Sequence, residues 1–198
     1  MPIKLNGTTF NNGGTVTFNG QTVKEIKFGT TTVWKAETDI STQFSASDYY
    51  HPNGAYQARS ISSGVITLNA TASLCKNIWT PAIALGDYST LKFTVNVTTS
   101  SAQAGNNAVR RLYVMANSTN TFTGDFSTRT DSVGGEGNSP GTTYYKIFPS
   151  PKVSDLNTGT RTITIDISSW TGSKKIGLCA LCGRANTLSM TISNIILA

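Results

Sequence analysis

Apolar and polar residues alternate along two stretches of this chain, and that period of two limits the fold more than any other feature. In residues 91–97 Leu, Phe and Val alternate with Lys, Thr and Asn, and in residues 162–167 Ile alternates with Thr and Asp. Side chains of a β-strand point to its two faces in turn, so both stretches predict strands with one buried and one exposed face. Less regular strands are expected at 65–70, 111–116, 144–148, 176–182 and 188–197. We find no segment with the period of an amphipathic helix.

Turn-forming segments separate these strands, and the composition agrees with an all-β protein. Residues 101–107 and 134–141 are rich in Gly, Asn and Ser. The chain of 198 residues is 38% hydrophobic and only 13% charged, which distinguishes it from a disordered protein. Half-buried strands separated by turns predict a two-sheet β-sandwich, and we expect a jelly roll.

The N-terminal residues predict a separate small β-meander over 3–35. Asn19-Gly20 lies between two β-prone runs, and Asn-Gly is the strongest short-range hairpin signal because both residues tolerate positive φ. Gly29 separates the next two runs. A sheet this small has little core of its own and needs to pack against something else. We therefore expect residues 1–36 to dock onto a partner, through the apolar side chains of Phe18, Phe28, Val33 and Trp34.

The predicted organisation thus has two parts joined by a short connection. Residues 1–36 form the docking module, and residues 43–198 form the sandwich. Residues 37–42 are polar and without pattern, which favours a linker.

Charge and cysteine content narrow the classes of partner and compartment. The net charge of +6 comes from 16 basic and 10 acidic residues, and the basic residues are dispersed rather than clustered. We therefore expect no nucleic-acid partner. No stretch approaches the roughly 20 apolar residues of a membrane span, and the first residues lack the apolar core of a signal peptide. Three cysteines, an odd number, favour a protein that folds in the cytoplasm over one with a disulfide framework.

The cysteine spacing does not predict a metal site. Cys179 and Cys182 have the C-x-x-C spacing of zinc and thiol-redox sites, but they lie in a predicted strand, where residues three apart point to opposite faces. We interpret them, and Cys75, as buried free cysteines that pack like small hydrophobic residues. No metal and no cofactor are expected.

The sequence also offers little for catalysis. His51 is the only histidine and lies in a loop containing Pro and Gly. Asp125, Asp131 and Glu136 fall in or near a Gly-rich loop rather than in a recognisable pair of catalytic carboxylates. We expect a protein without enzymatic activity.

Aromatic residues are the best candidates for ligand binding. Flat rings next to polar side chains suit sugars, whose C–H faces are apolar and whose hydroxyls need hydrogen bonds. The alternative is that these rings belong to the core and rim of the sandwich. The candidate ligand-binding residues are Tyr49, Tyr50, His51, Tyr56, Trp79, Arg110 and Tyr144.

Two resemblances suggest where such a protein belongs. Residues 16–35, VTFNGQTVKEIKFGTTTVWK, resemble the N-terminal module of virion proteins from phages of Gram-positive and gut bacteria, in which FNG repeats precede a variable β-rich domain. The chain contains three copies of this short motif, Leu5-Asn6-Gly7, Phe18-Asn19-Gly20 and Phe28-Gly29, and the third lacks the Asn. Residues 162–178 and 192–197 resemble galactose-binding-like jelly rolls, the sandwich of many carbohydrate-binding modules.

These resemblances imply a structural phage protein, assembled in the bacterial cytoplasm and located in the virion. It would bind other virion proteins through residues 1–36 and serve as a tail or baseplate accessory or a fibre that touches host polysaccharide. We also expect a homo-oligomer, because symmetric pairing stabilises a small sheet with an open edge. A capsid decoration or head-fibre protein is one alternative. A non-catalytic carbohydrate-binding module of a bacterial surface protein is another, and a hydrolase such as a depolymerase is a third.

Overall fold

The chain is built almost entirely from β-strands where its structure is described. The computed structural model describes residues 3–5, 8–10, 16–46, 59–71, 77–101, 110–118, 136–139, 143–148, 157–182 and 187–198. The one helical element in these ranges is a 3-10 turn, Ser41–Gln43. The expected all-β sandwich is therefore confirmed.

The first of two antiparallel sheets has the strand order β16-β12-β18-β10-β9, and β7 also pairs with β18. Its strands are β7 (Thr38–Asp39), β9 (Arg59–Ser62), β10 (Val65–Thr71), β12 (Thr90–Ser101), β16 (Gly159–Asp166) and β18 (Thr187–Leu197). Along β12, apolar residues such as Phe93 and Val95 are buried while Lys92 and Asn96 are exposed. The alternation read from the sequence is thus the alternation of burial.

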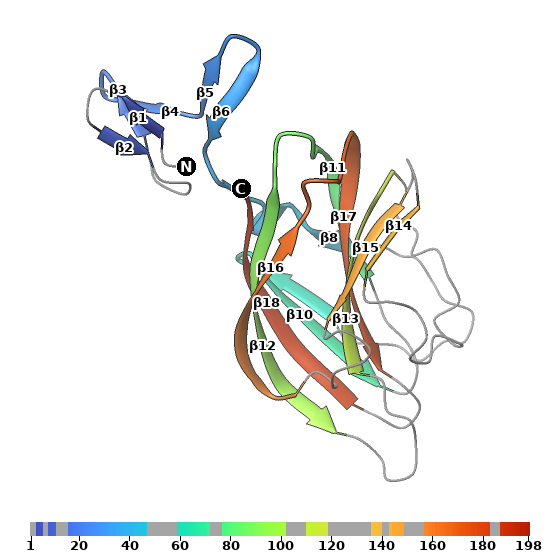
Figure 1. Ribbon diagram of the computed structural model, residues 1–198. Coiled ribbons are helices and arrows are strands. Elements are labelled where there is room, and N and C mark those ends of the chain that lie inside the picture. Colours follow the sequence, from blue (N-terminus) through green and yellow to red (C-terminus); the bar gives the residue numbers. More distant parts are fainter. Residues whose placement is uncertain are drawn as a thin grey trace.

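The second sheet has the strand order β14-β15-β13-β17-β11-β8. Its strands are β8 (Ser45–Ala46), β11 (Asn77–Ala84), β13 (Arg110–Asn117), β14 (Glu136–Ser139), β15 (Thr143–Phe148) and β17 (Ser173–Cys182). From β10 to β13 and again from β16 to β18, successive strands belong to alternate sheets, as in a jelly roll. Figure 1 shows the two sheets facing each other.

The core lies between the two sheets and is closed at one end by turns. Apolar residues of β10, β12, β16 and β18 pack there against those of β11, β13 and β17. Trp170 and Ile167, from the turn before β17, join the same core. The turn is fixed by main-chain hydrogen bonds from Trp170 N to Ile167 O (2.7 Å) and from Ile167 N to Ser89 O (2.8 Å).

Residues 37–42, expected to be a linker, are instead part of the sandwich. Strand β7 pairs with the end of β18, and Ile40 is fully buried in the core. Ile40 N donates to Ile195 O, and Ile195 N donates to Ser41 Oγ, both at 2.8 Å. The segment was predicted to be a linker because it is polar. The polar Ser41 is nevertheless buried, since its hydroxyl accepts the hydrogen bond of a main-chain N–H of β18. Asn194, at φ 53°, and Ile195 form a bulge in β18. Because of this bulge, the pairing of β18 with β12 supplies no acceptor for the Ile195 N–H.

At a bulge in β11, a side-chain hydroxyl likewise accepts the hydrogen bond of a main-chain N–H on the neighbouring strand. The register between β11 and β17 shifts between Trp79 and Ala82, where Thr80 and Pro81 stand opposite Ile176. In the described residues β8 pairs with β11 at Ile78 and Trp79, so β11 is an edge strand at Pro81. Proline is tolerated there because it has no N–H to donate to a neighbouring strand. Thr80 Oγ1 accepts the hydrogen bond of the buried Ile176 N–H at 2.9 Å.

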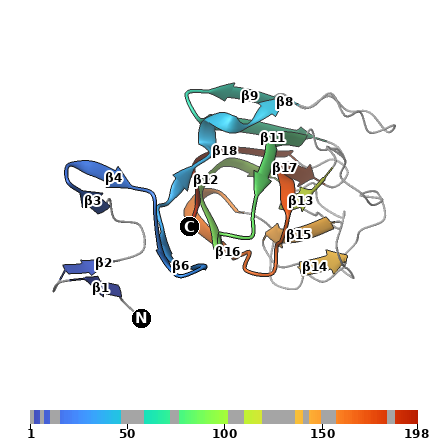
Figure 2. The same cartoon turned by 90° about the horizontal axis from the view of Figure 1, so that it is seen from above.

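The N-terminal strands form hairpins, each a separate two-stranded sheet. The strands are β1 (Ile3–Leu5), β2 (Thr8–Phe10), β3 (Val16–Phe18), β4 (Gln21–Val23), β5 (Glu25–Phe28) and β6 (Thr31–Lys35). Asn19 and Gly20 both have positive φ, 49° and 76°, as the predicted Asn-Gly turn requires. In both views these hairpins lie outside the layers of the sandwich (Figure 1, Figure 2).

Candidate functional site

Strand β13 of the second sheet is buried on both faces. Leu112, Val114 and Ala116 point into the core between the sheets. The alternate residues on β13 point away from that core and are nevertheless buried, at 5% exposure or less. These residues are Arg111, Tyr113, Met115 and Asn117.

Trp79 lies on the same side of the sheet and covers a glycine. It pairs in register with Gly177 of β17, and it is 2% exposed although it is not part of the central core. A Cβ built on Gly177 would come within 2.6 Å of the indole ring. The indole therefore lies flat against the strand, and glycine is required for that contact.

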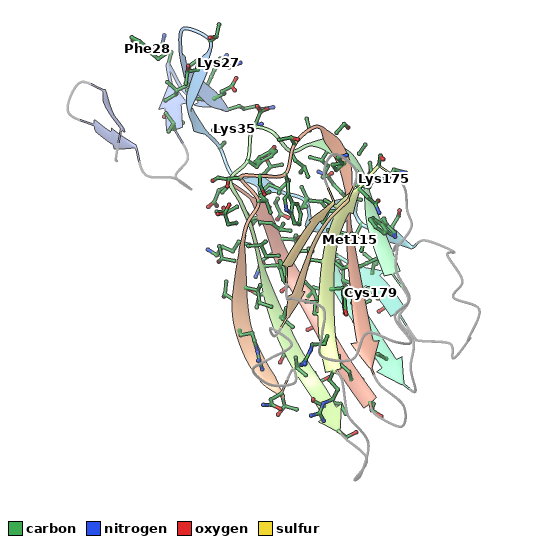
Figure 3. The ribbon with its side chains drawn as sticks, turned by 45° about the vertical axis from the view of Figure 1, so that its right-hand side comes forward. Lys27, Phe28, Lys35, Met115, Lys175 and Cys179 are labelled. Carbon is green, nitrogen blue, oxygen red and sulfur yellow. The ribbon has the colours of Figure 1, made fainter. Side chains whose placement is uncertain are left out.

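These residues define what we call the outer face of the second sheet. It consists of Trp79, Arg111, Tyr113, Met115, Asn117, Gly177 and Cys179. Cys179 pairs with Tyr113 on one side and with Asn77 on the other. Asn117 Nδ2 donates a weak hydrogen bond to Met115 Sδ at 3.6 Å. Figure 3 shows Met115 and Cys179 on adjacent strands of this sheet.

The described side chains of the outer face carry groups for stacking and for hydrogen bonding. It contains two aromatic rings, a guanidinium, an amide and sulfur atoms, but no carboxylate and no histidine. Among the residues that the structure describes, no group of three or more His, Cys, Asp or Glu could hold a metal ion. No helix in those ranges is long and apolar enough to span a membrane.

The structure places only part of the predicted ligand-binding set. Trp79 is on the outer face, buried rather than presented to solvent. Arg110 begins β13, is half-buried and pairs with Cys182. Tyr144 is described as backbone in β15, opposite Ala116. The other members of the predicted set, Tyr49, Tyr50, His51 and Tyr56, lie outside the described residues.

Sequence reasoning missed Arg111, Tyr113 and Asn117 as members of one face. The letters of β13, RRLYVMAN, do not alternate between apolar and polar residues. A continuous apolar run, here residues 112–116, is the signal of a strand buried on both faces.

The interpretation of Cys179 as a free thiol was wrong. Its side chain is fully buried, as expected, but it is disulfide-bonded. An odd number of cysteines suggested reduced thiols, yet it equally allows one bond and one remaining thiol.

Phe28 is the predicted docking residue whose side chain the structure describes. It ends β5 at the tip of the last hairpin and is 83% exposed. Figure 3 shows Phe28 at the end of the hairpin farthest from the sandwich, with Lys27 beside it. Lys27 Nζ forms an ion pair with Glu25 Oε2 at 3.1 Å. Phe18 lies in β3 and Val33 and Trp34 lie in β6, but their side chains are outside the described set.

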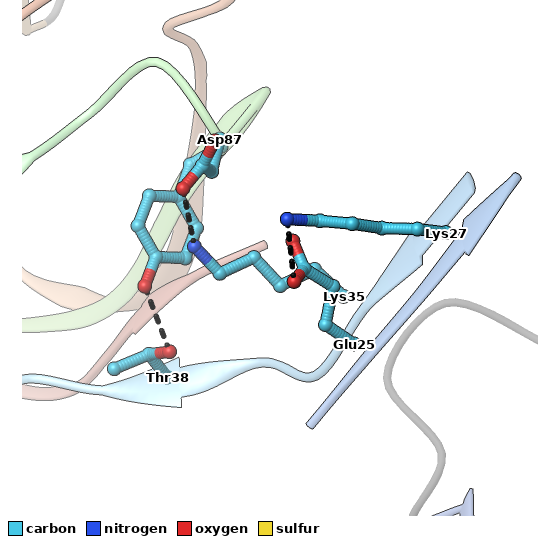
Figure 4. A network of polar contacts seen from close by, with 6 residues as sticks. Glu25, Lys27, Lys35, Thr38 and Asp87 are labelled. Atoms are coloured by element: carbon cyan, nitrogen blue, oxygen red, sulfur yellow. Dashed lines mark hydrogen bonds and ion pairs between the residues drawn. The ribbon is translucent and has the colours of Figure 1, made fainter. Parts of the chain in front are cut away.

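One polar cluster joins this hairpin to the sandwich. Lys35 Nζ is 3.0 Å from Asp87 Oδ2 and 4.1 Å from the centre of the Tyr88 ring. The Tyr88 hydroxyl is hydrogen-bonded to Thr38 Oγ1 at 3.0 Å (Figure 4). Burial acts to lower the pKa of Lys35, but the hydrogen bond to Asp87 and the charges on Tyr88 and Asp87 outweigh it, so the pKa is raised above 10.5. We call Lys35, Thr38, Asp87 and Tyr88 the hairpin joint.

Comparisons with known proteins do not place the chain in a family. No protein-family model matches it, and no curated protein matches it. One similar solved structure is the K3 cleaved adhesin domain of Lys-gingipain from Porphyromonas gingivalis W83, at 14% identity over 67% of this chain and 73% of that one. Another is TmCBM27, a carbohydrate-binding module that recognises mannan, at 13% identity over 81% of this chain and 94% of that one. Both TM-scores are 0.34, too low to carry an argument about fold or function.

Proposed function

We propose that this is a non-catalytic attachment protein of a phage virion. Its N-terminal hairpins dock onto another virion protein, and its sandwich is displayed outward, at the tail, baseplate or capsid. The observation that carries the proposal is the exposed Phe28 at the tip of a hairpin that shares no sheet with the sandwich.

Physical reasoning supports a docking role for this hairpin. An isolated two-stranded sheet is marginally stable in water, and a partner that covers its face supplies the missing burial. Burying a phenylalanine that is otherwise exposed contributes roughly 1.5–3 kcal/mol. At 83% exposure Phe28 has most of that contribution still to gain. The resemblance of residues 16–35 to virion modules supports another virion protein as that partner.

Cryo-electron microscopy of particles from a phage-producing culture that expresses this chain tests the proposal. We expect symmetric copies of the chain, with Phe28 in contact with another virion protein. In parallel, purified chain is mixed with particles that lack it, and bound chain is measured after sedimentation. Phe28→Ser should reduce binding at least tenfold, while Val65→Ser, at a 39%-exposed position on the sandwich, should not. Particles that never contain the chain would contradict the proposal.

A second candidate function, glycan binding by a bacterial surface module, is favoured by the outer face of the second sheet. There Trp79 and Tyr113 lie with Arg111 and Asn117, whereas the exposed residues of β12 and β16 are mainly Thr, Lys and Asn. Aromatic rings bordered by amide and guanidinium groups suit a sugar. Because both rings are buried, a sugar would contact them only after that face is uncovered.

Glycan-array binding of the full chain tests this second function. If the outer face is the site, Tyr113→Phe, which keeps the ring and removes one hydroxyl, should weaken binding severalfold. A matched change on the opposite sheet, Thr94→Val, should leave binding unchanged. A monomer that binds sugar and no particle would favour the surface module over the virion protein. Absence of binding to every glycan would remove this candidate.

A further inference from the structure

Strand β16 forms a long edge of the first sheet. It spans eight residues, Gly159–Asp166, and is the end strand in the order β16-β12-β18-β10-β9 (Figure 1). The other end strands of the two sheets are shorter in the described residues, since β9 and β14 span four residues each and β8 spans two. Natural proteins keep exposed edges short because an open edge pairs readily with another strand. The length of β16 therefore makes it the best edge of the sandwich for recognition.

The pairing of β16 with β12 shows which of its backbone groups are available. The two strands pair without a register shift along the whole of β16. Directly after this ladder, Ile167 N donates to Ser89 O at 2.8 Å, so the odd-numbered residues on this side are the ones bonded to β12. The N–H and C=O groups of Thr160, Thr162 and Thr164 therefore point away from β12. In the part of the chain that the structure describes, no strand pairs with that side of β16.

The side chains along this edge allow another strand to approach. Thr160, Thr162 and Thr164 are exposed, and threonine is a residue type that favours strands. Residues 160–165 contain no Pro, no Lys and no bulge, which are the devices that commonly block edge pairing. The charged residue among them is Arg161, and its guanidinium donates to the main-chain O of Asn157 in the same chain.

We propose that two copies of this chain pair through β16, antiparallel, about a two-fold axis at Ile163. Gly159 has φ 121°, outside the β region, so the regular edge is 160–166 and its midpoint is Ile163. An axis perpendicular to the sheet keeps both outer faces on the same side. Thr162 of one copy then faces Thr164 of the other, and each such pair exchanges two main-chain hydrogen bonds. Opposed threonines are also a favourable cross-strand pair.

The surrounding charges do not oppose this pairing. Lys92 of β12 lies next to Thr164 on the exposed face. In the paired copies the two Lys92 residues are three strand spacings and two residues apart, or about 15 Å. That separation exceeds the Debye length of about 8 Å at physiological salt. The expectation from the sequence placed the contact between copies at the small N-terminal sheet, whereas this proposal places it on the sandwich.

Sedimentation velocity of the purified full chain, over about 1–500 μM, tests the proposal. We expect the mass to rise with concentration from 21.1 kDa toward twice that value. Thr162→Pro removes an outward N–H and leaves the hydrogen bonds to β12 in place, so it should raise the Kd of the dimer about tenfold or more. A chain that stays monomeric, as expected if a strand of another protein occupies this edge, would overturn the proposal. A dimer that Thr162→Pro leaves intact would do the same.

Two double variants test the register and still decide if Thr162→Pro does not fold. Thr162→Lys combined with Thr164→Lys sets like charges opposite each other across the axis and should raise the Kd about tenfold or more. Thr162→Lys combined with Thr164→Glu sets opposite charges there, so this variant should dimerise at least as tightly as the wild type. Equal Kd values for the two variants would contradict the pairing. These measurements contain no phage particle, so their failure leaves the proposed function untouched.

Discussion

The two sheets of the sandwich contain similar residues on their inner faces and very different ones on their outer faces. On β12 of the first sheet, residues facing away from the core, such as Lys92 and Asn96, are exposed. On β13 of the second, the corresponding residues, such as Tyr113 and Asn117, are as buried as the core itself. The first sheet therefore has one buried and one solvent-exposed face, while β13 of the second sheet is buried on both faces.

This difference indicates where change is tolerated and where recognition is expected. The Thr and Lys side chains on the outer face of the first sheet contact solvent, so replacing them should change the free energy of unfolding little. An outer face containing Trp79 against Gly177 needs complementary shapes, so its residues constrain one another. Four predictions test the contrast and its surroundings, from the largest expected effect to the smallest.

The largest effect is expected for Trp79→Ala on the outer face of the second sheet. Removing a buried indole leaves a cavity and should lower the free energy of unfolding by about 3–5 kcal/mol. Lys92→Ala, on the outer face of the first sheet, should change it by about 0.5 kcal/mol or less. Urea denaturation of both variants measures the difference. Equal, small losses would show that the second sheet has no packed outer layer.

Gly177→Ala tests the contact beneath that indole. The added Cβ would lie 2.6 Å from a rigid ring, so either the ring or the strand must move. We expect a loss of about 1–3 kcal/mol in thermal or urea unfolding. Gly86→Ala is the matched control, because a Cβ there meets nothing within 4 Å. If both variants behave alike, Trp79 does not lie against β17.

Two hydroxyl groups should be of similar importance in the two sheets. Thr80→Val leaves the buried Ile176 N–H without its acceptor, and Ser41→Ala does the same to Ile195 N–H. Each should cost about 1–3 kcal/mol, measured by urea unfolding. Thr98→Val, which removes a hydrogen bond from an exposed position, should cost under about 0.5 kcal/mol. A marked inequality between Thr80 and Ser41 would mean that only one bulge is closed off from water.

The smallest effect concerns the hairpin joint, in which Lys35 contacts Asp87 and Tyr88 of the loop between β11 and β12. Lys35→Met should lower the free energy of unfolding by up to about 1 kcal/mol. Because folding raises the pKa of Lys35, its contribution is complete below pH 10.5 and is lost as the pH rises through the folded value. The difference from wild type should therefore shrink above that pH. Lys24→Met, at an exposed position, is the control, and a pH-independent difference would contradict the role of the charge.

The sequence by itself determined the class of fold and most of the strands. Alternation placed β12 and β16 because a sheet with one wet face needs a different residue type at every second position. Asn19-Gly20 placed a hairpin because few residues accept positive φ. These are local properties, decided by neighbours along the chain.

Tertiary structure alone decided what lies on each face and what becomes of polar residues. Ser41 and Thr80 look like turn or surface residues until β18 and β17 bring an N–H to each hydroxyl. Cys179 looks like a small hydrophobic residue until a second thiol meets it. The Trp79 indole packs against β17 because Gly177, 98 positions later in the sequence, lies directly opposite it. Burial and strand pairing depend on segments that are distant in the sequence, and a local pattern does not indicate which of those segments will pack against it.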